Sequence, residues 1–267
     1  MSDDKRKEAH SSTPVNTTRL GVYLLPNLLT TGTLFGGFYS VLVALEGRYV
    51  EGAIAIFAAM VFDGLDGRVA RMTGTQSEFG TQYDSLSDMV AFGVAPAVLV
   101  FTWMLGPIDK LGWSAAFIYT SCAALRLARF NTNADSAPSR YFQGLASPPA
   151  AALLASLVWS GAMLEQSALL AIAVGLITTS LGLLMVSNLV YPSFKDINFD
   201  KRVPFVFVLM AIIIAGIIMS DPPRLLLLCA TVYAVSSPIR WVVKRFRRQN
   251  WLQKMVPERL RGKHLDN

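Results

Sequence analysis

The chain alternates between apolar stretches and short polar segments. Eight apolar stretches run Leu20–Leu45, Val50–Gly64, Ser87–Leu105, Trp113–Phe130, Pro148–Met163, Ala168–Ser187, Val203–Met219 and Pro223–Val243. The longer ones are typical of helices that cross a bilayer, and the shorter ones, which carry Gly and Pro, are typical of helices packed within a bundle. The pattern predicts an all-α polytopic membrane protein with eight transmembrane helices and both termini on one side.

The basic residues predict which side that is. If both termini are cytoplasmic, all of the 24 Lys and Arg residues fall in cytoplasmic segments except Arg48, Lys110 and Arg224. Membrane proteins concentrate Lys and Arg in their cytoplasmic loops. The asymmetry therefore predicts cytoplasmic termini, in a multi-pass protein that we expect in a bacterial inner membrane.

Composition narrows the class of partner. Hydrophobic residues make up 53% of the chain, charged residues only 16%, and the mean hydropathy is +0.43. The net charge of +6 lies in tails and loops beside apolar stretches, which favours anionic lipid headgroups and argues against nucleic acid. Cys122 and Cys229 lie inside apolar stretches and are interpreted as buried free thiols.

Three regions follow from the same pattern. Residues 1–18 are polar and are expected to form a disordered cytoplasmic tail, and residues 19–245 form the transmembrane domain. Residues 246–267 form a basic tail that either lies on the membrane as an amphipathic segment or is solvated. Within the first apolar stretch, Gly32 and Gly36 are spaced for close helix contact.

Carboxylates are concentrated in one apolar region, between Asp63 and Asp88. Asp63 and Asp66 are three residues apart, and Asp84 and Asp88 are four apart. On a helix each spacing puts both members of the pair on one face. Two such faces could hold hard divalent cations, which prefer carboxylate oxygens.

The full pattern is Asp63-x-x-Asp66-Gly67-x-x-Ala70-Arg71, followed after eight residues by Gly80-x-x-x-Asp84-x-x-x-Asp88. It resembles the signature of the CDP-alcohol phosphotransferases, integral membrane enzymes of phospholipid synthesis. The resemblance implies an enzyme that displaces CMP from a CDP-linked lipid with an alcohol. It also implies a homodimer.

The resemblance implies roles for individual residues. The metal ligands are Asp63, Asp66, Asp84 and Asp88, which would hold two divalent ions, Mg²⁺ or Mn²⁺, and Asp88 would also be the general base. The candidates for binding the CDP-lipid are Asn27, Gly67, Ala70, Arg71, Ser77 and Gly80. The two glycines would let cytidine approach the backbone, and the planar guanidinium of Arg71 suits a phosphate. A cap beside Pro26 is an alternative role for Asn27.

Further stretches indicate the acceptor. Those that resemble the membrane-bound phosphatidylserine synthases are Leu25–Thr30, Ala124–Asn131, Phe142–Pro148, Met185–Asn188 and Tyr191–Lys195. This resemblance implies CDP-diacylglycerol and L-serine as substrates, with phosphatidylserine and CMP as products. Arg126 and Arg129 are candidates to bind the serine carboxylate or the lipid phosphate, although a pair at a helix end is also typical of a cytoplasmic boundary.

Two alternatives stay open at this point. One is a sister enzyme whose acceptor is glycerol phosphate, inositol phosphate or choline, because such an enzyme would share the aspartates. The other is a cation transporter, since carboxylates within the membrane also suit ion transport. Asp135 and Asp196 match no part of the signature and are interpreted as loop charges.

Overall fold

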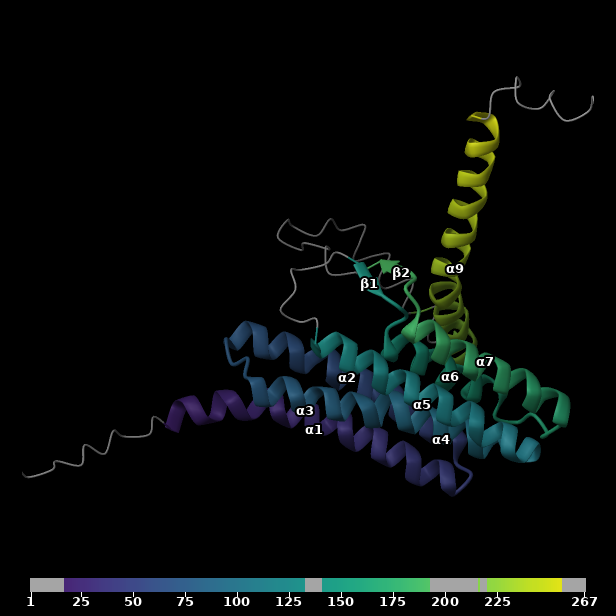
Figure 1. Cartoon of the computed structure of the whole chain (residues 1–267). Coiled ribbons are helices and arrows are strands. Elements are labelled where there is room, and N and C mark those ends of the chain that lie inside the picture. The colour runs from purple at the N-terminus through teal and green to yellow at the C-terminus, as the bar shows by residue number, and fades with distance from the viewer. Residues whose placement is uncertain (1–16, 133–140, 193–215, 217–219, 256–267) are drawn as a thin grey trace, which may run out of the picture.

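The computed structural model of the chain describes residues 17–132, 141–192, 216 and 220–255. The α-helices are α1 (Thr17–Leu45), α2 (Tyr49–Thr73), α3 (Glu78–Asp88), α4 (Ala95–Val100), α5 (Asp109–Thr132), α6 (Ser147–Gly161), α7 (Ala168–Val186) and α9 (Pro222–Met255). Two π-helical segments, η1 (Met89–Val94) and η2 (Phe101–Leu105), flank α4, and a short 3₁₀ turn, η3 (Gly106–Ile108), precedes α5. Two short strands complete the described fold, β1 (Tyr141–Gln143) and β2 (Val190–Pro192) (Figure 1).

The chain is mostly helical, as predicted, and helices cover seven of the expected apolar stretches. The remaining stretch, Val203–Met219, lies outside the described residues except for Gly216. Asp135, Asp196 and most of both tails also lie outside them. Four helical runs are long and apolar enough to cross a membrane: Leu24–Leu45, Glu78–Thr132, Ala168–Val186 and Pro222–Val243. These runs are consistent with an all-α membrane protein, while the count of eight spans and the side of the termini stay predictions.

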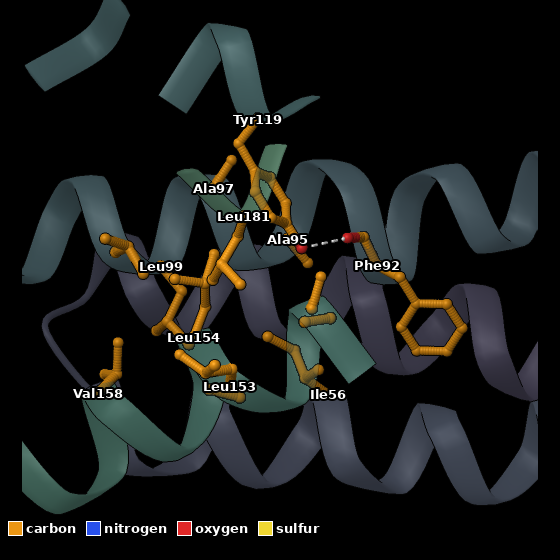
Figure 2. Packing of buried hydrophobic residues seen from close by; sticks show 14 of the residues in the cluster. Ile56, Phe92, Ala95, Ala97, Leu99, Tyr119, Leu153, Leu154, Val158 and Leu181 are labelled. Carbon is orange, nitrogen blue, oxygen red and sulfur yellow. Dashed lines mark hydrogen bonds between the residues drawn. The ribbon is translucent and has the colours of Figure 1, made fainter. Parts of the chain in front are cut away.

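The longest of these runs, Glu78–Thr132, contains a sharp turn. Asp109 begins α5 with a φ of 42°, a left-handed conformation that side chains seldom adopt. Beyond this turn α5 packs against η1 and η2, and the Tyr119 hydroxyl donates a hydrogen bond of 3.0 Å to the Phe92 carbonyl (Figure 2). The run is therefore two packed segments rather than one long span.

The core lies where α2, α4, α5, α6 and α7 meet. Figure 2 shows Ile56, Leu99, Leu154 and Leu181 from four of these helices pointing toward one another. All four side chains are buried. This core includes residues of α2, η1 and α4, so it packs the segments on either side of the aspartates together.

Helices cross closely where glycines of α1 face its neighbours. A Cβ on Gly36 would lie 3.0 Å from the Ala59 Cβ of α2, and one on Gly32 would lie 3.1 Å from the Phe62 ring. The predicted close contact is thus confirmed. Gly37 makes a tighter approach, because an added Cβ there would lie 2.6 Å from the Ala91 Cα in η1.

A small antiparallel pair, β1 with β2, joins the loops before α6 and after α7, and the sequence pattern did not predict it. The N–H of Gly144 donates to the Leu189 carbonyl (2.8 Å), and its φ of 80° favours glycine. The Tyr191 hydroxyl donates to the Ala234 carbonyl of α9 at 2.9 Å. The pair thus connects α6 and α7 to α9, whose far end projects away from the other helices (Figure 1).

The crossing at Gly37 gives a test of the packing. We expect Gly37→Ala to destabilise the protein by about 1–3 kcal/mol, because the methyl group would overlap the η1 backbone. The measurement is thermal unfolding in detergent. Gly64→Ala is the matched control, since a Cβ at Gly64 meets no atom within 4 Å, and it should cost nothing or stabilise α2 by up to about 1 kcal/mol. Equal stability of the two variants would contradict the close crossing.

Candidate active site

Local structure brings the two aspartate pairs together. Helix α2 ends at Gly74, whose φ of 64° is left-handed and whose N–H bonds to the Ala70 carbonyl. After a short link, Ser77 caps α3 by accepting a hydrogen bond from the Gly80 N–H (3.0 Å). After this turn α3 packs against α1, and its aspartates come close to those of α2.

The predicted cluster of carboxylates is present. One oxygen each from Asp63, Asp66 and Asp84 lie within 4.8 Å of one another. Asp88 joins the group, because its carboxyl lies within hydrogen-bonding reach of Asp63 and is also close in charge interaction with Asp84. The four residues named from the spacing thus meet at one place between α2 and α3.

The carboxylates differ in their support from the protein. Asp66 is buried and accepts a hydrogen bond from the Thr30 hydroxyl (2.8 Å). By contrast, one buried oxygen of Asp84 and one of Asp88 (Oδ1 in each) have no hydrogen-bond partner among the described residues. Buried acceptors without partners are costly, and so is a cluster of like charges.

A divalent cation fits this arrangement. The donor set is all carboxylate oxygen, which suits Mg²⁺ or Mn²⁺ and not a soft metal. A cation would give the orphaned oxygens of Asp84 and Asp88 a partner and would offset the repulsion. The cluster could therefore hold metal, as the sequence predicted.

Arg126 acts electrostatically on Asp88, whereas Arg129 bonds to another part of the fold. The Arg126 guanidinium from α5 interacts electrostatically with Asp88 and donates to the Ser147 hydroxyl at the start of α6 (2.9 Å). Arg129 is exposed and donates to the Val186 carbonyl at the end of α7 (3.1 Å). One predicted anion-binding residue is thus beside the aspartates, and the other lies at the α5–α7 boundary.

The candidates for binding the CDP-lipid flank the same cluster. A Cβ on Gly80 would lie 3.1 Å from the Ser77 Oγ and 3.6 Å from the Asn27 Oδ1, so α1 and α3 approach closely there. A Cβ on Gly67 would lie 3.5 Å from a guanidinium nitrogen of Arg71, which also attracts Asp66. The arrangement places the half-buried Gly67 and Gly80 and the exposed guanidinium of Arg71 beside the carboxylates.

Comparison with known proteins identifies the family. Residues 23–186 match the CDP-alcohol phosphatidyltransferase family. This protein belongs to that family. The four aspartates, Gly67, Arg71 and Gly80 all fall within the matched region of this CDP-alcohol phosphatidyltransferase.

Named relatives cover most of the chain. A CDP-diacylglycerol–serine O-phosphatidyltransferase of Helicobacter pylori strain J99 is 34% identical over 223 residues, which is 83% of this chain and 92% of the relative. The protein of the same name from Mycobacterium leprae is 32% identical over 91% of this chain and 81% of its own length. An archaetidylserine synthase of Methanothermobacter thermautotrophicus is 34% identical over 63% of this chain and 69% of its own.

Sequence reasoning missed three polar contacts around the site of this CDP-alcohol phosphatidyltransferase. Thr30 bonds Asp66, Ser147 bonds Arg126, and the Asn131 amide bonds the Ser85 hydroxyl (3.0 Å) to join α5 to α3. Thr30 had one available signal, as a small polar residue inside an apolar stretch, whereas Ser85, Asn131 and Ser147 lie just outside the ends of such stretches. The signal names no partner, because the partners lie 21 to 46 residues away in the chain.

The capping role of Ser77 can be separated from its predicted contact with CDP. Ser77→Ala should lower stability by about 1 kcal/mol through loss of the α3 cap, whereas Ser77→Asp keeps an acceptor for the helix. Ser167→Ala is the matched control, because Ser167 caps α7 in the same way (3.3 Å). Thermal unfolding and the KM for the CDP-lipid would be measured together. If Ser77→Ala changes that KM no more than Ser167→Ala does, Ser77 is only a cap.

Proposed function

We propose that the protein transfers the phosphatidyl group of CDP-diacylglycerol to the hydroxyl of L-serine, giving phosphatidylserine and CMP. The observation that carries this proposal is the meeting of the α2 and α3 carboxylates near Arg126, which is half-buried. Membership of the family supports the CDP-linked donor. The names of the relatives, which state serine as the acceptor, support the second substrate.

Asp63, Asp66, Asp84 and Asp88 would hold the divalent ions, which we take to be two. When bound, such ions neutralise the charge of a pyrophosphate and stabilise the charge that develops on the leaving group. Asp66 is the carboxylate already fixed by protein donors, and Asp84 and Asp88 each keep an oxygen available. The metal ligands therefore come equally from α2 and α3.

The donor lipid would bind along the faces of α2 and α3 next to the carboxylates. Arg71 is exposed and can pair with a phosphate through its planar fork. Gly67 and Gly80 would admit cytidine against the backbone, since neither presents a side chain. Ala70 on α2, Ser77 at the start of α3 and Asn27 on α1 complete the proposed contacts.

Asp88 would accept the proton of the serine hydroxyl. The serine oxygen then forms a bond to the phosphorus that carries diacylglycerol, and the bond from that phosphorus to the oxygen of CMP breaks, so CMP leaves with the electron pair. A carboxylate within hydrogen-bonding reach can act as this base. Arg126, which acts electrostatically on Asp88, would attract the serine carboxylate, and Arg129 would extend the positive region.

We further propose the predicted topology, with eight spans, both termini in the cytoplasm and the site at the cytoplasmic face of a bacterial inner membrane. Asp63 and Asp66 lie in the second half of α2, opposite the α1–α2 turn that contains Arg48. In that turn Arg48 forms ion pairs with Glu46 and Glu51. A homodimer is also proposed, and cross-linking in membranes would test it.

Asp88→Asn tests the general base. We expect turnover to fall by at least about 100-fold, because the amide cannot take the hydroxyl proton. Much of the binding of the CDP-lipid should remain, since three other carboxylates are unchanged. CMP release and binding of CDP-diacylglycerol would be measured on the same preparation. Near-normal turnover in this variant would exclude Asp88 as the base.

The reaction itself is tested by CMP release from purified protein in mixed micelles of CDP-diacylglycerol and Mn²⁺ or Mg²⁺. We expect release that requires L-serine and stops when a chelator removes the metal. Glycerol phosphate, inositol phosphate and choline serve as competing acceptors. Release with only one of these would overturn the serine acceptor, and cation transport in liposomes without CMP release from any acceptor would overturn the enzyme.

A further inference from the structure

One carboxylate of the cluster is held by a side chain from a helix that supplies no aspartate. Thr30, on α1, donates from its hydroxyl to Oδ2 of Asp66 on α2, with an oxygen–oxygen distance of 2.8 Å. Both residues are almost fully buried, with 4% of Thr30 and 5% of Asp66 exposed. A hydroxyl that bonds a carboxylate away from water forms a strong, charge-assisted contact.

The backbone holds this hydroxyl in place. The close crossing of α1 on α2 at Gly36 lets a short side chain span the two helices. Thr30 also lies 3.1 Å from the Pro26 carbonyl one turn earlier, a longer contact than the one to Asp66. Since a β-branched side chain in a helix has few rotamers, the hydroxyl has little freedom to turn elsewhere.

The other carboxylates have no comparable support. The orphaned Oδ1 atoms of Asp84 and Asp88 have no donor among the residues that the structure describes. Asp66 instead has the Thr30 hydroxyl as a donor. A hydrogen bond within the fold therefore sets the position of the Asp66 carboxylate, whereas no such bond holds Oδ1 of Asp84 or of Asp88 among the described residues.

We propose that Thr30 is a positioning residue for the metal site: by holding Oδ2 of Asp66, it fixes the orientation of that carboxylate within the cluster that it forms with Asp63 and Asp84. This inference rests on the proposed function, because it takes the cluster to be a site for divalent cations. Residues that orient a metal ligand from behind commonly affect metal affinity nearly as much as the ligands do. Helix α1 thus takes part in the site without supplying a ligand.

The test is direct Mn²⁺ binding to the full-length protein in detergent, measured by the electron paramagnetic resonance signal of free Mn²⁺. Thr30→Val removes the donor at nearly constant volume, and we expect it to weaken Mn²⁺ binding by about 10- to 100-fold. The Mn²⁺ concentration that gives half-maximal CMP release should rise by a similar factor. Thr30→Ser keeps the hydroxyl and should bind Mn²⁺ within a few-fold of wild type.

Thr33→Val is the matched control. Thr33 lies one turn further along α1, is fully buried, and donates to backbone carbonyls of Leu29 and Ala59 at 3.4 Å, but it contacts no carboxylate. The same substitution there should leave Mn²⁺ affinity unchanged. If Thr30→Val does not fold, Thr30→Ala and Thr30→Ser form a second pair that differs by one oxygen atom.

The outcomes separate the two proposals. Weak binding in Thr30→Val with near-normal binding in Thr30→Ser and Thr33→Val supports the positioning role. Binding in Thr30→Val equal to wild type overturns that role and leaves the proposed function intact. A wild-type protein that binds no Mn²⁺, with or without CDP-diacylglycerol, overturns the metal site itself and with it the proposed function.

Discussion

The candidate site depends on how closely α1 approaches its neighbours. Gly36 lets α1 contact α2, and Gly37 lets it contact η1 directly after Asp88. No larger side chain fits at Gly37 without moving the η1 backbone. The glycines therefore bring α1 against the two segments that carry the aspartates. The Thr30–Asp66 hydrogen bond and the Asn27–Gly80 approach both require this arrangement.

The same arrangement creates an electrostatic problem. Four carboxylates lie together in a partly buried place, and Arg126 is the cation that acts on Asp88 among the described residues. Like charges at such distances repel, and Thr30 donates a hydrogen bond to Asp66. The fold can tolerate this cost because the packed core beside it fixes the backbone of α2, α4 and α5. A divalent cation and a substrate pyrophosphate would then complete the balance of charge.

Much of this could be predicted from sequence, because the informative features are local. Spacing along a helix put Asp63 with Asp66 and Asp84 with Asp88, and the glycine spacing in α1 predicted its contact with α2. What could not be predicted depends on contacts between distant segments. The β1–β2 pair and the Ser147 contact with Arg126 have no periodic signal, since each requires knowing which segments meet. Ser77 was expected at the substrate, and its visible role is the cap of α3.

The uneven support of the carboxylates suggests how metal binding and stability are connected. Asp66 is fixed before any ligand arrives, so it can receive a cation without reorganisation. Asp84 and Asp88 lie on the segment that leads into η1, and their orphaned oxygens make the ligand-free pairing of α2 with α3 costly. A ligand that binds only the folded state stabilises it in proportion to the logarithm of its concentration above Kd. Under the proposed function, a bound cation would therefore stabilise the approach of the α3 carboxylates to Asp66, as well as take part in the reaction.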